Sequence, residues 1–391
     1  MIDTYQSLIA NWSYPTQVRF GPGRIAELAN ACRGAGMRAP LFVTDPGLSG
    51  LNIVTDTLGT LEEAGLSTVL FSDLQANPVA ANVDKGVEIF RQGHHDGMIA
   101  FGGGSALDTA KAIAFMSGQS RPIWDFEDRE DWWTRADPAG IAPVVGVPTT
   151  AGTGSEMGRA AVITDERDHT KKIIFHPKML PVEVIADPAL TCGLPPAITA
   201  ATGMDALSHC LEAYSSPFWH PMGQGIALEG MRLVKEWLPE AVENGGNVEA
   251  RAFMLAASSM GAVAFQKGLG AMHAMSHPCS SLKGTHHGLT NAVVMPYVLR
   301  HNMGAIEEKL AALSRYLGLG STATAFIDWV LALRAQLHIP NTLEEIGVTA
   351  DLIPQLAPMA LEDPSSGGNP VPMTRGAYEE LYEKAINGTL T

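Results

Sequence analysis

Short apolar segments of strand length alternate with helical stretches through the first half of the chain, and this alternation constrains the fold most. Five such segments, most of them followed by turn residues, lie at 39–45, 67–74, 97–104, 143–150 and 182–187. Strands that alternate with helices of about 10–15 residues are typical of βαβ units, whose strands are parallel. The first half of the sequence therefore predicts an α/β domain built on a parallel sheet.

The pattern changes after about residue 190. Apolar residues then recur at three- and four-residue spacing, with few β-branched runs, in 194–216, 223–244, 248–266 and 304–318. That period predicts helices. Because 391 residues exceed the usual size of a single core, two domains are expected. We predict an α/β domain over 1–189 and an all-helical domain over 190–391, with a ligand-binding cleft where they meet.

Composition restricts the partners of the protein. A net charge of −15 argues against a nucleic acid or an anionic membrane as partner, because both need a basic surface. The start of the chain lacks a basic segment followed by an apolar core, and no later run approaches the roughly 20 apolar residues of a membrane span. The four cysteines form no disulfide or zinc-knuckle pattern. We therefore expect a cytoplasmic enzyme with no nucleic-acid or membrane partner.

A cluster of histidines with an aspartate is the strongest functional signal. Asp205 and His209 stand four residues apart, as do His273 and His277, and His287 follows. Residues four apart share one face of a helix, so each pair can present two ligating groups. The cluster predicts a divalent-metal site, and its ligand types suit either Fe(II) or Zn(II). Core histidines satisfied by ordinary hydrogen bonds are the alternative.

A glycine-rich turn in the first half indicates a nucleotide site. Three glycines, Gly102 to Gly104, separate an apolar strand from a helix for which Ser105 is the expected N-cap. Free N–H groups at the start of a helix favour a phosphate. Asp45 ends another strand, where a carboxylate can accept hydrogen bonds from a ribose diol and repel a 2′-phosphate, which favours NAD over NADP.

Each of these turns also has a plainer interpretation. The three glycines can form a tight turn without a ligand, and Asp108 and Lys111 on the helix that follows can be a solvated ion pair. A second turn rich in glycine and hydroxyl groups, at 147–156, is either part of a cofactor or substrate site or merely a polar loop.

Four segments occur in order along the chain: GGGSALDTAK, VPTTAGTGSE, LPPAITAATGMDALSHCLEAY and GAMHAMSHPCSSLKGTHHGLTNAVVMPYVLRHN. Together they resemble the iron-containing (group III) alcohol dehydrogenases, and the resemblance covers nearly the whole chain. It implies the fold shared with dehydroquinate synthase, an N-terminal α/β dinucleotide-binding domain followed by an all-helical domain. A dimer or larger homo-oligomer is usual in this family.

The resemblance also implies roles for individual residues. The metal ligands would be Asp205, His209, His273 and His287. The NAD-binding residues would be Asp45, Gly102, Gly103, Gly104, Ser105, Asp108, Thr149, Thr150 and Lys172. His277 would lie close to the nicotinamide and the substrate instead of binding the metal, a choice that spacing leaves open.

This site predicts hydride transfer. Hydride leaves an alcohol carbon readily when the oxygen has alkoxide character, which a Lewis-acidic metal favours, and NAD accepts the hydride. His277 is the candidate for relaying the alcohol proton. We expect an NAD- and metal-dependent dehydrogenase acting on a small alcohol, aldehyde or ketone. The alternatives are a metal- and NAD-dependent lyase or cyclase of the dehydroquinate synthase type, a metal-dependent hydrolase, and a binding protein without activity.

Basic residues near the site bear on the choice of substrate. Arg159, Lys267 and Lys283 lie in or beside segments that carry the predicted site, and Phe265 precedes the histidine-bearing helix. Arginine and lysine pair well with carboxylates. These residues therefore predict either a binding site for a short hydroxy acid or semialdehyde, or exposed cations that balance local acidic groups.

Overall fold

The computed structural model describes residues 10–12, 16–168 and 170–390, and the chain divides into two compact units. The first unit comprises Met1–Thr150 and Gly154–Gly193, and the second comprises Ala151–Thr153 and Leu194–Thr391. The chain thus changes unit after Gly193, where we expected the change after residue 189. The first nine residues of the chain, from which the absence of a targeting segment was judged, lie outside the described residues.

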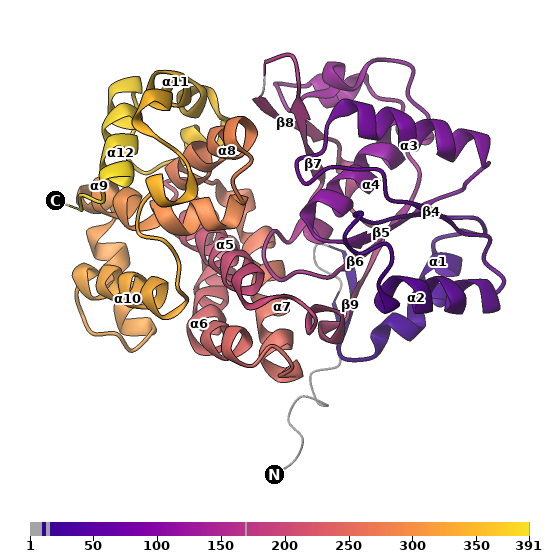
Figure 1. Ribbon diagram of the computed structural model, residues 1–391, viewed down its shortest axis with the longest axis horizontal. Coiled ribbons are helices and arrows are strands. Elements are labelled where there is room, and N and C mark those ends of the chain that lie inside the picture. Colours follow the sequence, from indigo (N-terminus) through magenta and orange to yellow (C-terminus); the bar gives the residue numbers. More distant parts are fainter. Residues whose placement is uncertain (1–9, 13–15, 169, 391) are drawn as a thin grey trace, which may run out of the picture. The chain divides into compact units, whose positions relative to one another are not determined.

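A seven-stranded sheet organises the first unit, with the strand order β1-β2-β9-β6-β5-β3-β4 (Figure 1). Its strands are β1 Ala10–Trp12, β2 Gln17–Phe20, β3 Leu41–Val43, β4 Val69–Phe71, β5 Met98–Gly102, β6 Val144–Pro148 and β9 Glu183–Ala186. Neighbouring strands are parallel except for the β1–β2 pair. The five predicted strands are confirmed as β3, β4, β5, β6 and β9, whereas β1 and β2 were not expected.

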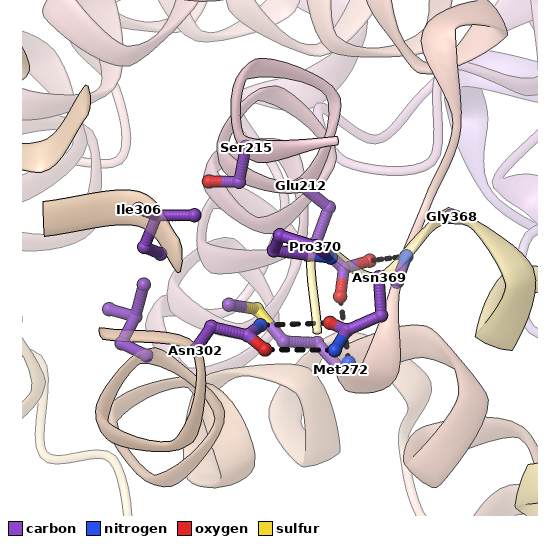
Figure 2. Close-up of a pocket in the computed structure, with 10 residues that line it drawn as sticks. Glu212, Ser215, Met272, Asn302, Ile306, Gly368, Asn369 and Pro370 are labelled. Atoms are coloured by element: carbon purple, nitrogen blue, oxygen red, sulfur yellow. Dashed lines mark hydrogen bonds between the residues drawn. The ribbon is translucent and has the colours of Figure 1, made fainter. Parts of the chain in front are cut away.

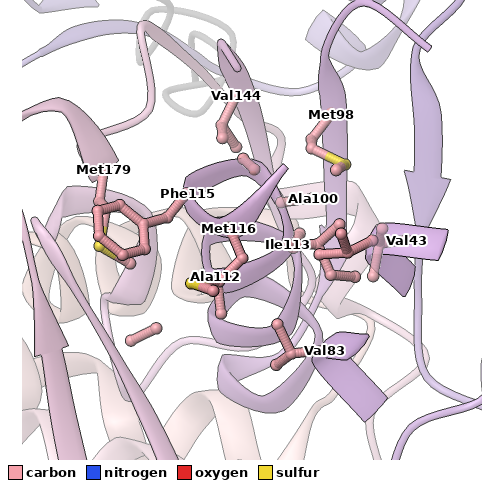
Figure 3. Close-up of a cluster of buried hydrophobic side chains, with 14 of the residues drawn as sticks. Val43, Val83, Met98, Ala100, Ala112, Ile113, Phe115, Met116, Val144 and Met179 are labelled. Atoms are coloured by element: carbon pink, nitrogen blue, oxygen red, sulfur yellow. The ribbon is translucent and has the colours of Figure 1, made fainter. Parts of the chain in front are cut away.

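Helices cover both faces of this sheet. Helices α1 Leu28–Gly34 and α2 Asn52–Glu63 pack on one face, and α3 Ala80–Gln92 and α4 Gly104–Met116 pack on the other. Successive strand residues point to opposite faces, so the side chain of Phe42 joins the first core and that of Val43 joins the second. Figure 3 shows the second core, where Val43 lies beside Ile113 of α4. Burial on both faces explains why β3, β5 and β6 contain no charged residue.

An antiparallel hairpin stands apart from the large sheet. It consists of β7 Ala160–Asp165 and β8 Thr170–Phe175. Most residues of β8 are only partly buried, and the sequence analysis did not predict this hairpin.

The described residues of the second unit form helices joined by loops, with no strand. Its α-helices are α5 Pro196–Ser215, α6 Pro221–Glu243, α7 Val248–Ala264, α8 Ala271–Lys283, α9 His287–Tyr316, α10 Ala323–Gln336, α11 Ile353–Glu362 and α12 Arg375–Asn387. The four predicted helical segments are confirmed within α5, α6, α7 and α9. Helix α5 packs against α6, α7 and α9, and every residue from Thr199 to Ser215 is buried. Polar side chains on α5 therefore need partners inside the unit.

One helical stretch of the described residues, Val248–Lys267, has the length and hydropathy of a membrane span. The expectation that no segment approaches these properties is therefore corrected. Of its most apolar window, 67% is buried inside the structure, as in the core helix of a globular unit, so its composition is weak evidence for a membrane.

Candidate active site

Three of the four predicted metal ligands converge in the second unit. Asp205 lies in the middle of α5, His273 in the first turn of α8, and His287 is the first residue of α9. Oδ1 of Asp205 is 4.0 Å from Nε2 of His273 and 3.6 Å from Nε2 of His287. One ligand atom from each residue lies within 4.8 Å of the other two. Atoms that each sit about 2 Å from one divalent ion have a spread of this order.

His209, the fourth predicted ligand, lies beside this group. Its ring stacks on that of His273, with 4.7 Å between centroids and 19° between planes. Burial lowers the pKa of His209 to about 4, so the imidazole is neutral near pH 7 and keeps a lone pair. A hydrogen bond to the backbone of Gly152 opposes this lowering of the pKa, and the buried Nδ1 of His209 has no partner of good geometry among the described residues. A neutral imidazole with an orphaned nitrogen fits a metal ligand.

Glu212 holds His273 from the side away from the other ligands. Its Oε2 accepts hydrogen bonds from Nδ1 of His273 (2.7 Å) and from the backbone N–H of Gly270 (2.8 Å). Its Oε1 accepts a third, from the backbone N–H of Met272 at 2.7 Å. Figure 2 shows this carboxylate and the backbone of α8 that it binds. With Nδ1 donating, Nε2 of His273 keeps its lone pair, an arrangement typical of metal-ligating histidines.

The same carboxylates change the acidity of His273. Burial alone lowers the pKa of His273, but the hydrogen bond from its ring to Glu212 and the charges of Glu212 and Asp205 outweigh burial, so its pKa is raised. The surroundings of this ring therefore favour positive charge, which a bound cation would supply.

Asn291 lies between the same three ligand atoms. Its Nδ2 donates to Oδ1 of Asp205 at 2.8 Å and is 3.2 Å from Nε2 of both His273 and His287. Its side chain is fully buried. The sequence analysis missed Glu212 and Asn291, although helical spacing could have found them. Glu212 follows His209 by three residues, and Asn291 follows His287 by four, so each shares a helix face with a predicted ligand.

A glycine sets how closely α9 approaches α5. A Cβ atom on Gly288 would lie 2.4 Å from the carbonyl oxygen of Ala201 and 2.9 Å from Cβ of Asp205. No larger residue fits there without moving the backbone. This close contact between the helices brings His287 within reach of Asp205.

His277 does not join the converging ligands. Its ring stacks on His287, with 5.1 Å between centroids and 12° between planes. Its Nδ1 is 2.8 Å from Oδ2 of Asp363, a residue that the sequence analysis did not select. Burial alone raises the pKa of Asp363, but the charge of His277 and hydrogen bonds from His277 and Ser365 outweigh it, so the pKa of Asp363 is lowered. Asp363 is therefore a carboxylate that faces His277.

A small cavity lies beside Glu212 (Figure 2), and none of the predicted metal ligands is among the residues that line it. It has room for about one water molecule, which is too little for an alcohol substrate. Asn302 and Asn369 line it and exchange two hydrogen bonds of 2.8 Å. Oδ1 of Asn369 also accepts the backbone N–H of Ala271 at 3.2 Å. Asn369 and Glu212 together satisfy N–H groups at the start of α8 that a helix leaves without partners.

The glycine turn of the first unit lies beside Asp45. A Cβ on Gly102, whose φ is 145°, would lie 2.8 Å from Cβ of Ala106 and 3.5 Å from Oδ2 of Asp45. Oδ1 of Asp45 accepts the N–H groups of Gly47 (2.9 Å) and Leu48 (3.1 Å). The predicted ribose-binding carboxylate and the predicted phosphate-binding turn are thus neighbours.

The predicted N-cap of α4 is wrong. Gly103 is the N-cap and α4 begins at Gly104, because the glycine backbone of the turn lets the helix start earlier. The hydroxyl of Ser105 donates to the carbonyl of Ala76 instead, at 2.5 Å.

Thr149 and Thr150 contact the glycine turn at Gly102 and Gly103. The N–H of Thr149 donates to the carbonyl of Gly102 at 3.0 Å, and a Cβ on Gly103 would lie 3.2 Å from Cγ2 of Thr150.

Asp108 and Lys111 form a buried pair. Lys111 is 1% exposed, and its Nζ lies 3.1 Å from Oδ1 of Asp108. Oδ2 of Asp108 accepts the N–H of Val162 on β7 at 3.0 Å. The alternative of a solvated pair is therefore wrong, and the pair ties the hairpin to α4. Lys172 on β8 forms its own ion pair with Asp165, at 2.5 Å.

The candidate substrate residues have different surroundings. Arg159 and Lys283 are exposed, and the ring of Phe265 lies 5.2 Å from that of His209. Lys267 is only 3% exposed. Its ammonium donates to the carbonyls of Ala213 (2.8 Å), Tyr214 (3.3 Å) and Ser216 (2.6 Å) at the end of α5. All three donors of Lys267 are therefore engaged by the backbone, a role that the sequence analysis did not foresee.

Comparison with known proteins agrees with this architecture. The family model described as iron-containing alcohol dehydrogenase matches residues 15–188, and that of the C-terminal part of the Fe-containing alcohol dehydrogenase family matches 199–386. The chain is 36% identical over 384 residues to 4-hydroxybutyrate dehydrogenase of Cupriavidus necator, covering 95% of this chain and 99% of that protein.

Two further relatives extend the comparison. The chain is 35% identical over 386 residues to NAD-dependent methanol dehydrogenase of Bacillus methanolicus, covering 97% of this chain and all of that protein. The crystal structure of a 1,3-propanediol oxidoreductase has a TM-score of 0.89 and 35% identity, covering 94% of this chain and 97% of that one. These relatives do not favour the lyase alternative. The chain therefore belongs to the iron-containing alcohol dehydrogenase family and is an oxidoreductase of the alcohol dehydrogenase type.

Proposed function

We propose that the protein is an NAD-dependent, metal-activated dehydrogenase that interconverts a small alcohol with its aldehyde or ketone. The observation that carries this proposal is the convergence of Asp205, His273 and His287 within 4.8 Å. His209 stacks beside them and Glu212 orients His273.

The donor set fits a divalent metal. One carboxylate and imidazole nitrogens suit Fe(II) or Zn(II), and the family's name points to iron. Asp205, His209, His273 and His287 would hold the ion. When bound, such a metal supplies Lewis acidity that favours alkoxide character on the alcohol.

The first unit offers the parts of an NAD site. The backbone N–H groups at the start of α4 suit a pyrophosphate, and Asp45 lies beside the glycine turn, where it suits a ribose diol. The carboxylate of Asp45 would repel the 2′-phosphate of NADP. One of the relatives is named as NAD-dependent, which supports the choice of NAD.

His277 is the proposed proton relay. Nδ1 is bound to Asp363, so Nε2 is the nitrogen available to take the proton of the alcohol. Bound NAD would accept the hydride from the alcohol carbon.

The substrate class is proposed as short alcohols, including hydroxy acids. One relative is named for 4-hydroxybutyrate, which carries a carboxylate, and another for methanol, which does not. Among the basic residues considered, Arg159 and Lys283 are exposed, whereas Lys267 is engaged by α5. Arg159 and Lys283 are therefore the remaining candidates for a substrate carboxylate.

We also propose a cytoplasmic location, supported by four free cysteines.

The test is NADH formation by metal-stripped protein that is resupplied with Fe(II) or Zn(II). The substrates are 1-butanol and 4-hydroxybutyrate, which differ in the terminal carboxylate. We expect NADH only after metal is added. Asp205→Asn should abolish this response, whereas Asp56→Asn, at an exposed position on α2, should leave it unchanged. Tight NAD binding without NADH from any short alcohol would overturn the proposal.

A further inference from the structure

Asp363 caps a short 3-10 helix with one carboxylate oxygen and binds His277 with the other. The described residues contain three Asp-Pro turns in which the aspartate caps a short 3-10 helix, at Asp137, Asp187 and Asp363. In each turn Oδ1 accepts the backbone N–H two residues later, at 2.9, 3.0 and 2.8 Å. Capping therefore occupies only one oxygen of Asp363. Its Oδ2 binds Nδ1 of His277 at 2.8 Å, across 86 residues of sequence.

This contact fixes the tautomer of His277. The side chains are 7% exposed at Asp363 and 14% exposed at His277, so water competes little for the hydrogen bond. An ionised carboxylate only accepts hydrogen bonds, and Nδ1 must therefore carry the proton. In the neutral ring the lone pair is then on Nε2.

The orientation of the ring is fixed as well. His277 stacks on His287 at 5.1 Å and meets His273 edge to face, with 5.9 Å between centroids and 64° between planes. The carboxylate of Asp363 fixes the rotation of the ring about its own axis. Within the described part of the chain, Nε2 makes no hydrogen bond, so this edge of the ring is left for a ligand.

We propose that Asp363 is a positioning residue for His277, which holds the Nδ1–H tautomer and presents the Nε2 lone pair to the proton of the alcohol. This inference rests on the proposed dehydrogenase function. In the oxidation direction the alcohol O–H bond breaks and its proton forms a bond to Nε2. The C–H bond breaks with its electron pair, which passes to NAD⁺ as hydride, and the products are the carbonyl compound, NADH and an imidazolium. Asp363 stays ionised and stabilises that imidazolium through Nδ1–H.

The test compares Asp363→Asn with Asp137→Asn. In both variants the asparagine Oδ1 can still cap its turn, but only Asp363 contacts a histidine. We expect Asp363→Asn to lower kcat by about 10- to 100-fold, which is less than the roughly 100- to 10,000-fold that proton transfer by a positioned side chain contributes, because His277 itself remains. KM should change by less than about threefold and metal content should not change, because Asp363 is not a ligand. Asp137→Asn should match the unmodified enzyme in all three.

A second measurement does not depend on activity. Nitrogen-15 NMR of the histidine rings in the unmodified, Zn(II)-loaded protein reports which nitrogen carries the proton, and His277→Gln assigns the signal. We expect the Nδ1–H form in the unmodified protein and loss of its dominance in Asp363→Asn.

Each outcome decides a different point. An unmodified protein whose His277 is mainly protonated at Nε2, or an active Asp363→Asn enzyme with unchanged kcat, would overturn the role of Asp363 alone. Failure of the unmodified protein to oxidise any alcohol would overturn the proposed function and, with it, the role of Asp363 in proton transfer. The tautomer measurement tells the two failures apart, because it reports the ring geometry even without turnover.

Discussion

Replacing Glu212 with glutamine tests whether this buried carboxylate holds the metal ligand His273. Glu212 is 5% exposed and accepts three hydrogen bonds, two at Oε2 and one at Oε1. Glutamine has the same shape but one NH2 group, which would face at least one of these donors. Losing one hydrogen bond to a charged group costs about 1.5–3 kcal/mol. We therefore expect the free energy of unfolding of the metal-free protein to fall by at least this amount.

Metal affinity should fall as well. Removing a carboxylate that orients a metal-ligating histidine typically weakens metal binding by about 10- to 100-fold, which corresponds to about 1.4–2.8 kcal/mol. Urea unfolding measures the first quantity, and competition with a chelator of known affinity measures the second. The control is Glu236→Gln on α6, where an exposed ion pair with Arg232 contributes little. A folded Glu212→Gln protein that binds Zn(II) as tightly as the unmodified protein would refute this account.

Three further predictions concern other parts of the structure. Asn291→Ala should lower the unfolding free energy of the metal-free protein by about 1–3 kcal/mol. The loss should be smaller in the metal-loaded protein, because a bound cation satisfies the same ligand atoms. Equal losses of unfolding free energy in urea titrations with and without Zn(II) would contradict this. Asp45→Asn keeps the turn but removes the charge, so the ratio of kcat/KM with NAD to that with NADP should fall by about tenfold or more; an unchanged ratio would exclude Asp45 as the selecting residue. The hydrogen bond from Arg167, opposed by burial and aided by Lys172, lowers the pKa of Asp165. The ionised carboxylate therefore stabilises the folded protein at pH values above the unfolded pKa near 4, and this stabilisation is lost as the pH falls further. Asp165→Asn should lower the free energy of unfolding at about pH 6, and the difference in that free energy between the variant and the unmodified protein should shrink as the pH is lowered.

The sequence predicts strands whose residues are all buried better than strands whose residues are only partly buried. Strands β3, β5 and β6 are buried on both faces and therefore appear in the sequence as continuous apolar runs, and β9 is apolar after Glu183. The β8 strand is mostly half-buried, and it contains Lys171 and Lys172, so neither an apolar run nor clean alternation marks it. The error at Ser105 has a local cause, because consecutive glycines leave the first residue of a helix undetermined.

The candidate site likewise contains residues that helical spacing predicts and residues that it does not. Helical spacing pairs Asp205 with His209, and the structure places both on one buried stripe of α5. Spacing leaves the roles of His273 and His277 open, and only their distant partners separate them. Glu212 lies 61 residues from His273, and Asp363 lies 86 residues from His277. A contact across such a separation leaves no periodic trace in the sequence, so local patterns cannot predict it.

The support of α8 by residues far along the chain has a consequence for biosynthesis. All four expected ligands have been synthesised once His287 is added, but Asp363 and Asn369 follow much later. Asn369, which binds the backbone N–H of Ala271, follows His287 by 82 residues, and at about 5–20 residues per second the ribosome needs roughly 4–16 s to reach it. During that interval the nascent chain carries the four ligands and Glu212 but lacks Asp363 and Asn369, which also hold α8. We therefore expect the four ligands to bind a metal stably only after Asn369 has been added.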